Sequence, residues 1–231
     1  MMNYEIVPLP KEKWKGTDVP IRYTTDSYFD LELTESDNAF SARMVKKQFE
    51  TPVTHTPEEY DFPDKLYQDH WEKAEAYGIV GEDGALLACI ELCPEEWSNR
   101  ILVTELWVAD QLHRKGIGTR LMNLAKEKAK EQGRRAIILE TQSCNVRAIA
   151  FYRSQGFRLI GFDSCCYANN DIARHEIRFN FGFYLPQAAT EGEDGNRPET
   201  KERGKMAEAR IPVKASPSST CLRSPNRCTV R

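Results

Sequence analysis

The sequence predicts an α/β fold in which helices alternate with the strands of a mixed sheet. Short apolar runs show the two-residue period of strands, and two longer segments show the 3.6-residue period of amphipathic helices. The composition, 40% hydrophobic and 29% charged among 231 residues, is typical of a globular protein with a buried core. No apolar run approaches the roughly 20 residues that a membrane-spanning helix needs, so we expect no membrane partner.

Four segments in the first half have the pattern of strands. Tyr4–Val7 is expected to be the first. Ala76–Val80 and Ala85–Cys93 flank an Asp-Gly turn and are predicted to form a hairpin. Arg100–Ala109 alternates and is rich in Ile, Leu, Val and Trp, so it is expected to be a central strand.

The period changes after residue 115. From Gly116, apolar side chains recur at helical spacing until Gly133, which predicts one amphipathic helix. Asn145–Gln155 is expected to be the next helix. The strands predicted around these helices are Arg135–Thr141, Phe157–Phe162 and His175–Leu185.

Two segments have less regular patterns. Ile21–Thr51 is polar and amphipathic, and helical portions are expected around Ser36–Lys46. Residues 187–231 contain no aromatic residue and are dominated by Glu, Gly, Pro, Ser, Lys and Arg, a composition that favours disorder. We therefore expect a folded domain over residues 1–186 and a disordered tail over residues 187–231.

Charge and cysteine content narrow the partners and the compartment. The tail carries 9 Lys and Arg and 6 Asp and Glu, which leaves 23 and 29 upstream, a net charge of −6. This sign disfavours nucleic acid and favours a small cationic substrate or a basic peptide, although an acidic surface without a ligand is also compatible with it. The start of the chain lacks the pattern of a secretory signal, and the seven cysteines are scattered. We expect a cytoplasmic protein with free thiols and no metal.

A strand followed by a glycine-containing loop and a helix forms an anion site, because the first N–H groups of a helix have no intrahelical partner. The run His113-Arg114-Lys115-Gly116-Ile117-Gly118-Thr119 has this order. Its glycines allow close approach of a pyrophosphate, and Arg114 and Lys115 add positive charge. The run is neither a Walker loop nor a Rossmann fingerprint.

A second motif lies one strand further along the chain, at Asn145-Val146-Arg147-Ala148-Ile149-Ala150-Phe151-Tyr152-Arg153-Ser154-Gln155-Gly156-Phe157. Together the two motifs resemble the GNAT superfamily of acetyl-coenzyme A-dependent N-acetyltransferases over residues 76–185. The resemblance implies a mixed, mostly antiparallel central sheet flanked by helices. One departure is His113, which stands where the family usually has Arg or Gln.

The resemblance implies acetyl-CoA as co-substrate and assigns residues to it. The pyrophosphate cradle would be His113, Arg114, Lys115, Gly116, Ile117, Gly118 and Thr119. The strand at Leu106, Trp107 and Val108 would bind the pantetheine arm through its backbone, and Asn145 would also hold the cofactor.

Three residues are candidates for catalysis. Tyr152 matches the tyrosine that in many family members protonates the departing thiolate, although a buried aromatic anchor is the alternative. An amine with a pKa near about 10.4 must lose a proton before it attacks, which requires a carboxylate. Glu140 matches, by its spacing to Asn145 and Tyr152, the base of the ribosomal-protein N-terminal acetyltransferases. Glu105 lies mid-strand among apolar residues, on the expected face of Val103 and Trp107; either carboxylate is also compatible with substrate binding or pairing with an arginine.

The acceptor is suggested by a narrower resemblance. Leu139-Glu140-Thr141-Gln142, Gly161-Phe162-Asp163 with Tyr167, and His175-Glu176 before the last strand are similar to the streptothricin acetyltransferases. This similarity implies a cationic antibiotic as substrate and makes Asp163 and Glu176 candidates for binding it. The alternatives are a protein N-terminal or lysine acetyltransferase and a non-catalytic coenzyme A binding module. A monomer or a homodimer is expected.

Overall fold

The computed structural model describes residues 4–59 and 64–186. The tail predicted over residues 187–231, with Cys221 and Cys228, lies outside the described residues. The five cysteines within them, Cys89, Cys93, Cys144, Cys165 and Cys166, are free thiols, as expected.

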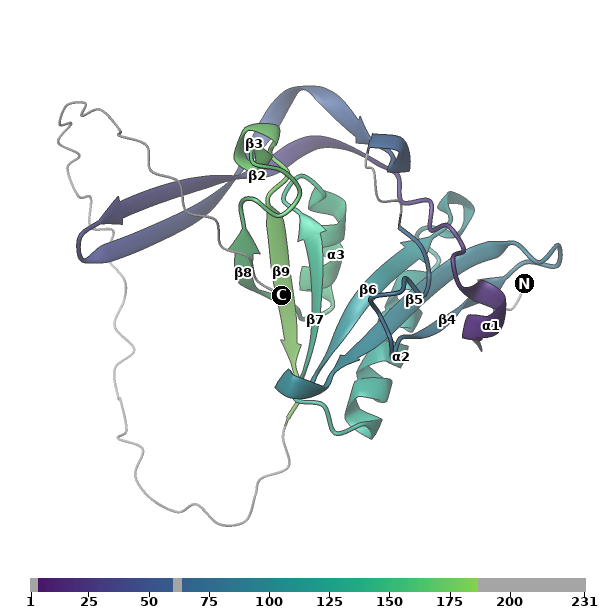
Figure 1. The fold of residues 1–231 in the computed structure, drawn as a ribbon. Helices are drawn as coiled ribbons and strands as arrows, with labels where there is room; N and C mark the ends of the chain where they lie inside the picture. Colours follow the sequence, from purple (N-terminus) through teal and green to yellow (C-terminus); the bar gives the residue numbers. More distant parts are fainter. Residues whose placement is uncertain (1–3, 60–63, 187–231) are drawn as a thin grey trace, which may run out of the picture. The chain divides into compact units, whose positions relative to one another are not determined.

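A seven-stranded mixed sheet forms the centre of the described domain (Figure 1). Its strands lie in the order β1-β4-β5-β6-β7-β9-β8, and every neighbouring pair is antiparallel except β6 and β7. The strands are β1 Val7–Pro8, β4 Glu75–Val80, β5 Leu86–Glu95, β6 Arg100–Val108, β7 Ala136–Gln142, β8 Arg158–Asp163 and β9 Arg178–Tyr184. This mixed, mostly antiparallel sheet confirms the predicted fold class.

Two longer helices pack on the sheet. The helices are α1 Lys11–Trp14, α2 Ile117–Glu131, α3 Val146–Ser154 and α4 Asp171–Arg174, with 3₁₀ turns at Pro57–Glu59, Glu96–Ser98 and Asp110–Leu112. The buried residues of α2 recur at helical spacing and are Ile117, Leu121, Met122, Ala125 and Ala129. This stripe contacts β5, β6 and β7, so the amphipathic pattern predicted after residue 115 is the buried face of α2.

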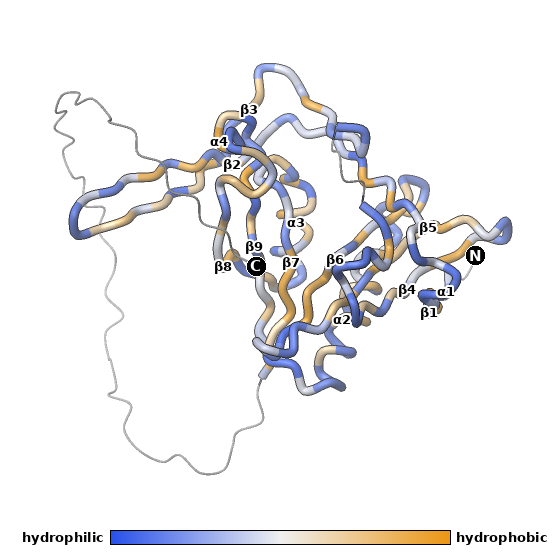
Figure 2. The backbone as a smooth tube through the Cα atoms, viewed as in Figure 1, coloured by the Kyte–Doolittle hydropathy of each residue, from blue (hydrophilic) through white to orange (hydrophobic). Residues whose placement is uncertain are grey.

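The sheet separates two hydrophobic clusters. Along β5, Ala88, Ile90 and Leu92 belong to the larger cluster with α2 and α3, whereas Cys89 belongs to the smaller one. Because successive strand residues point to opposite faces, the clusters lie on opposite sides of the sheet. The smaller cluster is completed by Leu9, Trp14, Val19, Leu66, Tyr67 and Ala76. Figure 2 shows the hydrophobic colour of β5, β6 and β7, as expected for strands buried on both faces.

The helical prediction for Ser36–Lys46 is wrong. Tyr23–Ser36 and Ala39–His55 are strands β2 and β3, which pair with each other as an antiparallel two-stranded ribbon. The physical reason is a two-residue period: Phe29, Leu31 and Leu33 alternate with polar residues, and Asp37-Asn38 provides a turn between the strands.

Other boundaries differ less. The last strand begins at Arg178 and not at His175, because Asp171–Arg174 form α4 and His175 has a φ of 61° that ends it. In the first predicted strand, only Val7 pairs with β4, together with Pro8.

Candidate active site

Strands β6 and β7 are paired over half of their length and then separate. Their parallel register runs from Arg100 opposite Ala136 to Val103 opposite Leu139 and ends there. Beyond this point the strands diverge, as Figure 1 shows. The separation leaves the β7-facing backbone edge of residues 105–108 outside the ladder.

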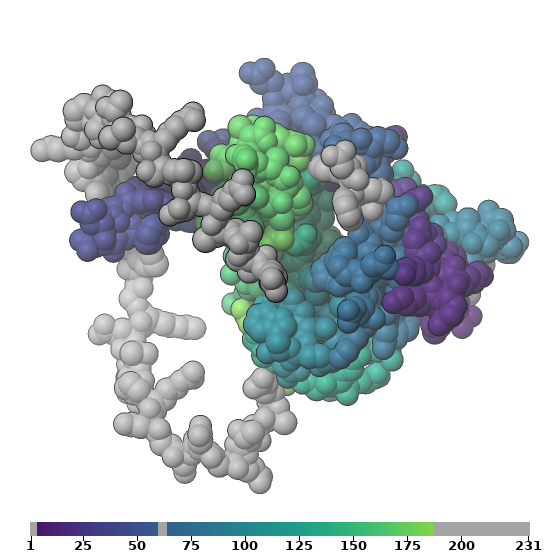
Figure 3. Space-filling model, viewed as in Figure 1, coloured from purple at the N-terminus to yellow at the C-terminus, as the bar shows by residue number. Residues whose placement is uncertain are grey.

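A cavity of about 680 Å³ opens where the strands separate. Its wall includes the ends of β6 and β7, the first turns of α3, the base of the ribbon and the segment before β4. Figure 3 shows this face of the molecule hollowed between the green segment before β9 and the blue segment before β4. The catalytic candidates Glu105, Glu140 and Tyr152 all line the cavity.

A β-bulge brings Glu105 to the cavity. In the β5–β6 register Glu91 pairs with Glu105 and Leu92 with Val103, so Thr104 is the extra residue. Val103 therefore packs in the larger cluster, while Trp107 packs against the smaller one. The expectation that Glu105 shares a face with both Val103 and Trp107 holds for Trp107 alone, because the bulge reverses the alternation.

Glu105 and Tyr152 are both withdrawn from solvent. Glu105 is 5% exposed, and burial together with the negative charges of Asp64, Glu91 and Glu140 raises its pKa to about 9. Burial, and secondarily the charge of Glu105, raises the pKa of Tyr152 to about 12. At neutral pH the phenol therefore keeps its proton and remains a hydrogen-bond donor.

Four carboxylates, those of Glu59, Asp64, Glu105 and Glu140, give the cavity an acidic character. Asp64 lines it beside Glu105, and its pKa is raised by burial and by the charge of Glu140. The Glu140 carboxylate lies 3.2 Å from an Arg178 guanidinium nitrogen, and its pKa is raised by burial against the lowering effect of Arg178. Glu140 is thus partly neutralised by an arginine, while the Glu105 carboxylate has no hydrogen bond or ion pair within residues 4–59 and 64–186.

The predicted cofactor residue Asn145 caps α3. Its Oδ1 accepts a hydrogen bond of 3.1 Å from the Ala148 N–H, as an N-cap does, and the residue also lines the cavity. The N-cap hydrogen bond alone accounts for an asparagine at position 145, whether or not the residue also binds a ligand.

The predicted pyrophosphate loop lies at the start of α2. Gly116 is the N-cap residue, with a φ of 76°, and the Arg120 N–H donates 3.0 Å to its carbonyl. The N–H groups of Ile117, Gly118 and Thr119 therefore point out of the helix end, where they can bind an anion. His113, Arg114 and Lys115 are exposed beside them. These residues fit a pyrophosphate.

The two glycines of this loop have different roles. Gly116 needs its positive φ, and a side chain there would meet nothing within 4 Å. At Gly118 a Cβ would lie 3.3 Å from the Phe151 ring, so this glycine allows α2 and α3 to pack closely. His113 donates a 2.8 Å hydrogen bond from Nε2 to the carbonyl of Val108, which ties the loop to the end of β6.

Asp163 and Glu176 are not among the residues that line the cavity. Asp163 accepts a hydrogen bond from the Cys165 N–H and lies 3.6 Å from Arg178. Glu176 is 4% exposed and accepts a 2.9 Å hydrogen bond from Arg174. Both carboxylates position arginines beside the cavity.

The cavity also contains residues that the sequence motifs did not indicate. Asp64 comes from a loop without a motif, and Tyr23 and His55 are the paired first and last residues of the ribbon. The Tyr23 and His55 rings stack with centroids 4.9 Å apart, and His55 Nδ1 lies 3.2 Å from Glu59. The ribbon thus contributes an aromatic wall to the cavity.

In residues 4–59 and 64–186, no three His, Cys, Asp or Glu side chains are grouped so that they could hold a metal ion. Over the same part of the chain, no helix has the length and apolarity to cross a bilayer.

Comparison with known proteins shows what this arrangement resembles. The model of the acetyltransferase (GNAT) family matches residues 42–157. A streptothricin acetyltransferase of Streptomyces lavendulae is 30% identical over 152 residues, which cover 63% of this chain and 76% of that protein.

Solved structures share the fold. A nourseothricin acetyltransferase superposes with a TM-score of 0.59 at 24% identity and covers 79% of this chain and 98% of its own. A Bacillus anthracis protein solved in complex with acetyl coenzyme A gives a TM-score of 0.61 at 20% identity, covering 80% of this chain and all of its own.

Proposed function

The chain belongs to the acetyltransferase (GNAT) family, and from this premise we propose that it acetylates a primary amine of a cationic antibiotic of the streptothricin type. Family membership makes it an acetyl-CoA-dependent N-acetyltransferase. The identity of the acceptor and the roles of individual residues are our proposal.

The observation that carries the proposal is the carboxylate-lined cavity between the separated ends of β6 and β7. Asp64, Glu105 and Glu140 line it together, and the only arginine that pairs with any of these three carboxylates in the described part of the chain is Arg178, with Glu140. Burial and the neighbouring negative charges oppose ionisation of Glu105, so a cation that enters the cavity stabilises its charged form. An ammonium group is such a cation.

We assign the acetyl-CoA donor to the start of α2 and to the edge of β6 that β7 leaves unpaired. The first N–H groups of α2, with Arg114 and Lys115, would bind the pyrophosphate of acetyl-CoA. The edge of β6 at Leu106, Trp107 and Val108 is not paired with β7, and the Val108 carbonyl accepts from His113; its remaining backbone groups would bind the pantetheine arm as an added strand does. Bound acetyl-CoA supplies the acetyl group as an activated thioester.

Glu105 and Tyr152 carry the proton transfers in this proposal. Glu105 takes a proton from the substrate ammonium, and the freed amine nitrogen bonds to the acetyl carbonyl carbon. The carbon–sulfur bond breaks as Tyr152 gives its proton to the leaving sulfur. The extra proton that remains on the new amide nitrogen restores the Tyr152 phenol, and Glu105 releases its proton to solvent. The raised pKa of Glu105 brings its basicity closer to that of an alkylamine, which favours the first transfer.

Glu140 is the alternative base, and its pairing with Arg178 makes it the weaker one. The guanidinium at 3.2 Å stabilises the ionised carboxylate and lowers its affinity for a proton. We therefore assign Glu140 to binding the cationic acceptor. Its spacing to Asn145 and Tyr152 keeps a protein N-terminal or lysine acetyltransferase as the second candidate function.

The choice of an antibiotic rests on charge and on the relatives. Streptothricin carries several cationic groups, which suit a cavity with four carboxylates and a domain with a net charge of −6. The Streptomyces lavendulae relative is named for acetylating this compound. A reaction that uses acetyl-CoA fits the predicted cytoplasmic location.

Release of coenzyme A thiol, measured with three acceptors, tests the proposal. We expect kcat/KM to be highest for streptothricin, lower for spermidine and lowest for a basic peptide. A peptide preferred over streptothricin would favour the second candidate function. Binding of acetyl-CoA without turnover of any acceptor would instead indicate the non-catalytic coenzyme A binding module.

A further inference from the structure

The β2–β3 ribbon has one charged face and one apolar face. In its register Leu31 pairs with Met44, Leu33 with Ala42, and Glu35 with Phe40, so these six side chains share a face. The opposite face carries the ion pairs of Lys47 with Asp30 and Glu32, and of Arg43 with Glu32. This alternation is typical of a ribbon that is covered on one side.

The body of the described domain covers only the inner part of the apolar face. Leu31 is 7% exposed and belongs to the larger core, and Phe29 and Met44 pack against it. Every residue from Glu32 to Arg43 is exposed, including Leu33 at 47% and Phe40 at 85%. Figure 1 shows this outer half of β2 and β3 extending away from the sheet. A two-stranded ribbon is at best marginally stable alone, so a partner that covers the outer half would stabilise it.

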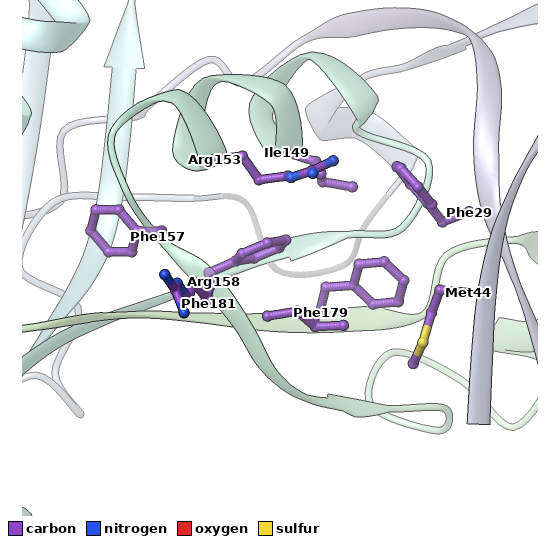
Figure 4. Close-up of a pocket in the computed structure, with 9 residues that line it drawn as sticks. Phe29, Met44, Ile149, Arg153, Phe157, Arg158, Phe179 and Phe181 are labelled. Carbon is purple, nitrogen blue, oxygen red and sulfur yellow. The ribbon is translucent and has the colours of Figure 1, made fainter. Parts of the chain in front are cut away.

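An apolar groove begins where the covered part of the ribbon ends. Figure 4 shows Phe29 and Met44 at one end, Ile149 and Arg153 on α3, and Arg158 where β8 begins. The groove has a volume of about 350 Å³. Its floor is formed by Phe179 and Phe181 of β9, and Leu159 of the edge strand β8 is 41% exposed beside it.

The charges of groove and ribbon tip are complementary. Arg153 and Arg158 are exposed, and neither has an ion pair within the described ranges. At the tip, Glu35 and Asp37 are exposed acids that also lack an ion pair there. The molecule therefore carries a basic, apolar groove and an acidic, apolar tip.

We propose that the apolar face of the ribbon is a homodimer interface, in which the ribbon tip of one subunit occupies the groove of the other. Phe40 of the partner subunit contacts Phe29 and Met44, and the acids of the partner's tip pair with Arg153 and Arg158. Both surfaces exist on each chain, so one contact implies its symmetric equivalent.

The spacing along the ribbon is consistent with a two-fold axis. Ala42 lies two residues from Phe40 and two from Met44, and Leu33 is its cross-strand partner. An axis at the Leu33–Ala42 pair, with the ribbons antiparallel, therefore places each Phe40 on the opposite Met44. The separation of Phe40 from Met44, about 13 Å at about 3.3 Å per residue, lets each tip reach the groove.

The interface and the cavity lie at two ends of the same ribbon. Its base pair, Tyr23 and His55, lines the cavity, and the Phe29 N–H donates 3.0 Å to the Ser143 carbonyl just after β7. Dimerisation holds the ribbon and with it this aromatic wall. The interface itself is testable by mass alone, independently of any activity.

Sedimentation velocity of the full chain tests the interface. We expect a species of twice the chain mass of 26.5 kDa. Phe40→Asp and Leu33→Asp should raise the dimer dissociation constant at least about tenfold. The matched controls Ser41→Asp and Thr34→Asp add the same charge on the opposite face and should leave the dimer intact.

A charge exchange makes the test specific to the groove. Glu35→Arg and Arg158→Glu should each weaken the dimer, and the double variant should restore it, because the pair is re-formed with its signs reversed. Circular dichroism checks that each variant is folded. A wild-type chain that stays monomeric up to about 100 µM, or a dimer that tolerates Phe40→Asp and Leu33→Asp together, overturns the proposal.

Discussion

Glu91 and Glu105 are direct register partners across β5 and β6, and the two buried carboxylates differ in their partners. Glu91 is fully buried and accepts hydrogen bonds of 2.6 Å from the Tyr67 N–H and 2.8 Å from the Thr104 hydroxyl. Glu105 lines the cavity. Glu91 thus secures the bulge residue and the loop that follows Asp64, while Glu105 is left for chemistry.

Replacing Glu105 by Gln tests its role as base. In the wild type kcat/KM should rise with pH through a value near 9, because burial and neighbouring carboxylates raise the pKa of Glu105 and the ionised form is the active one. Glu105→Gln should lower kcat/KM at pH 8 about 100-fold. In the pH profile of this variant, only the rise that follows deprotonation of the substrate amine, with a pKa of about 10.4, should remain.

Glu140→Gln is the matched control for this profile. Removal of the Glu140 charge should lower the pKa of Glu105 slightly, so the rise of kcat/KM that follows ionisation of Glu105 should move to lower pH but persist. The opposite pattern, a limb lost in Glu140→Gln and kept in Glu105→Gln, would identify Glu140 as the base and contradict our assignment.

The same carboxyl group affects stability. Its folded pKa of about 9 exceeds the unfolded value of about 4.3, so the folded state binds the extra proton and stability falls as pH rises between these values. The difference in melting temperature between Glu105→Gln and the wild type should therefore increase in favour of the variant from pH 5 to pH 8, by about 3 °C or more. Glu82→Gln, an exposed substitution in the β4–β5 turn, should show no such trend. If the melting temperatures of Glu105→Gln and the wild type change equally with pH, the Glu105 carboxyl group is ionised in the folded state.

Tyr152→Phe tests the general acid. Loss of the phenol should lower kcat about 100-fold while the affinity for acetyl-CoA, measured by calorimetry, changes little. The control is Tyr184→Phe, which removes a hydroxyl from a 62% exposed residue at the end of β9. If kcat falls equally in both variants, or in neither, Tyr152 has only a packing role.

Asp64→Asn tests recognition of the cationic acceptor. Because Asp64 lines the cavity, loss of its charge should raise the KM for streptothricin about tenfold and leave the KM for acetyl-CoA unchanged. Asp83→Asn, in the β4–β5 turn, removes the same charge away from the cavity. An unchanged streptothricin KM in Asp64→Asn would exclude the residue from the acceptor site.

Gly116→Ala tests the pyrophosphate loop against an internal standard. Gly116 and Gly84 have φ values of 76° and 83°, and a Cβ at either would meet nothing within 4 Å. Each alanine variant should therefore lose a similar stability, about 1 kcal/mol. Only Gly116→Ala should raise the KM for acetyl-CoA. Equal effects of both variants on this KM would contradict a role of the loop in binding.

Local patterns were sufficient to predict most of the sheet and the order of its functional elements. The helix after Gly116 and the strand before Glu140 have strong periods, and the anion loop follows from helix-end geometry. The β2–β3 ribbon was not predicted because its polar sequence is compatible with both the two-residue period of a strand and the 3.6-residue period of a helix. The cross-strand pairing decides between them.

Tertiary contacts explain what the motifs did not indicate. The bulge at Thr104 changes the face of Glu105, and no property of the residue itself signals this. Asp64 reaches the cavity because its loop is tied to the sheet: the Leu66 N–H donates to Thr17, and the Tyr67 N–H donates to the buried Glu91. The charges of Asp163 and Glu176 made them candidates for binding a cationic substrate. In the structure Asp163 pairs with Arg178 and Glu176 with Arg174.

Mass spectrometry of streptothricin after incubation with the enzyme and acetyl-CoA tests the central claim most directly. We predict that the antibiotic gains one acetyl group on an amine, with release of one equivalent of coenzyme A thiol, and that Tyr152→Phe slows both together. Streptothricin that stays unmodified, while the same preparation binds acetyl-CoA, would contradict the account.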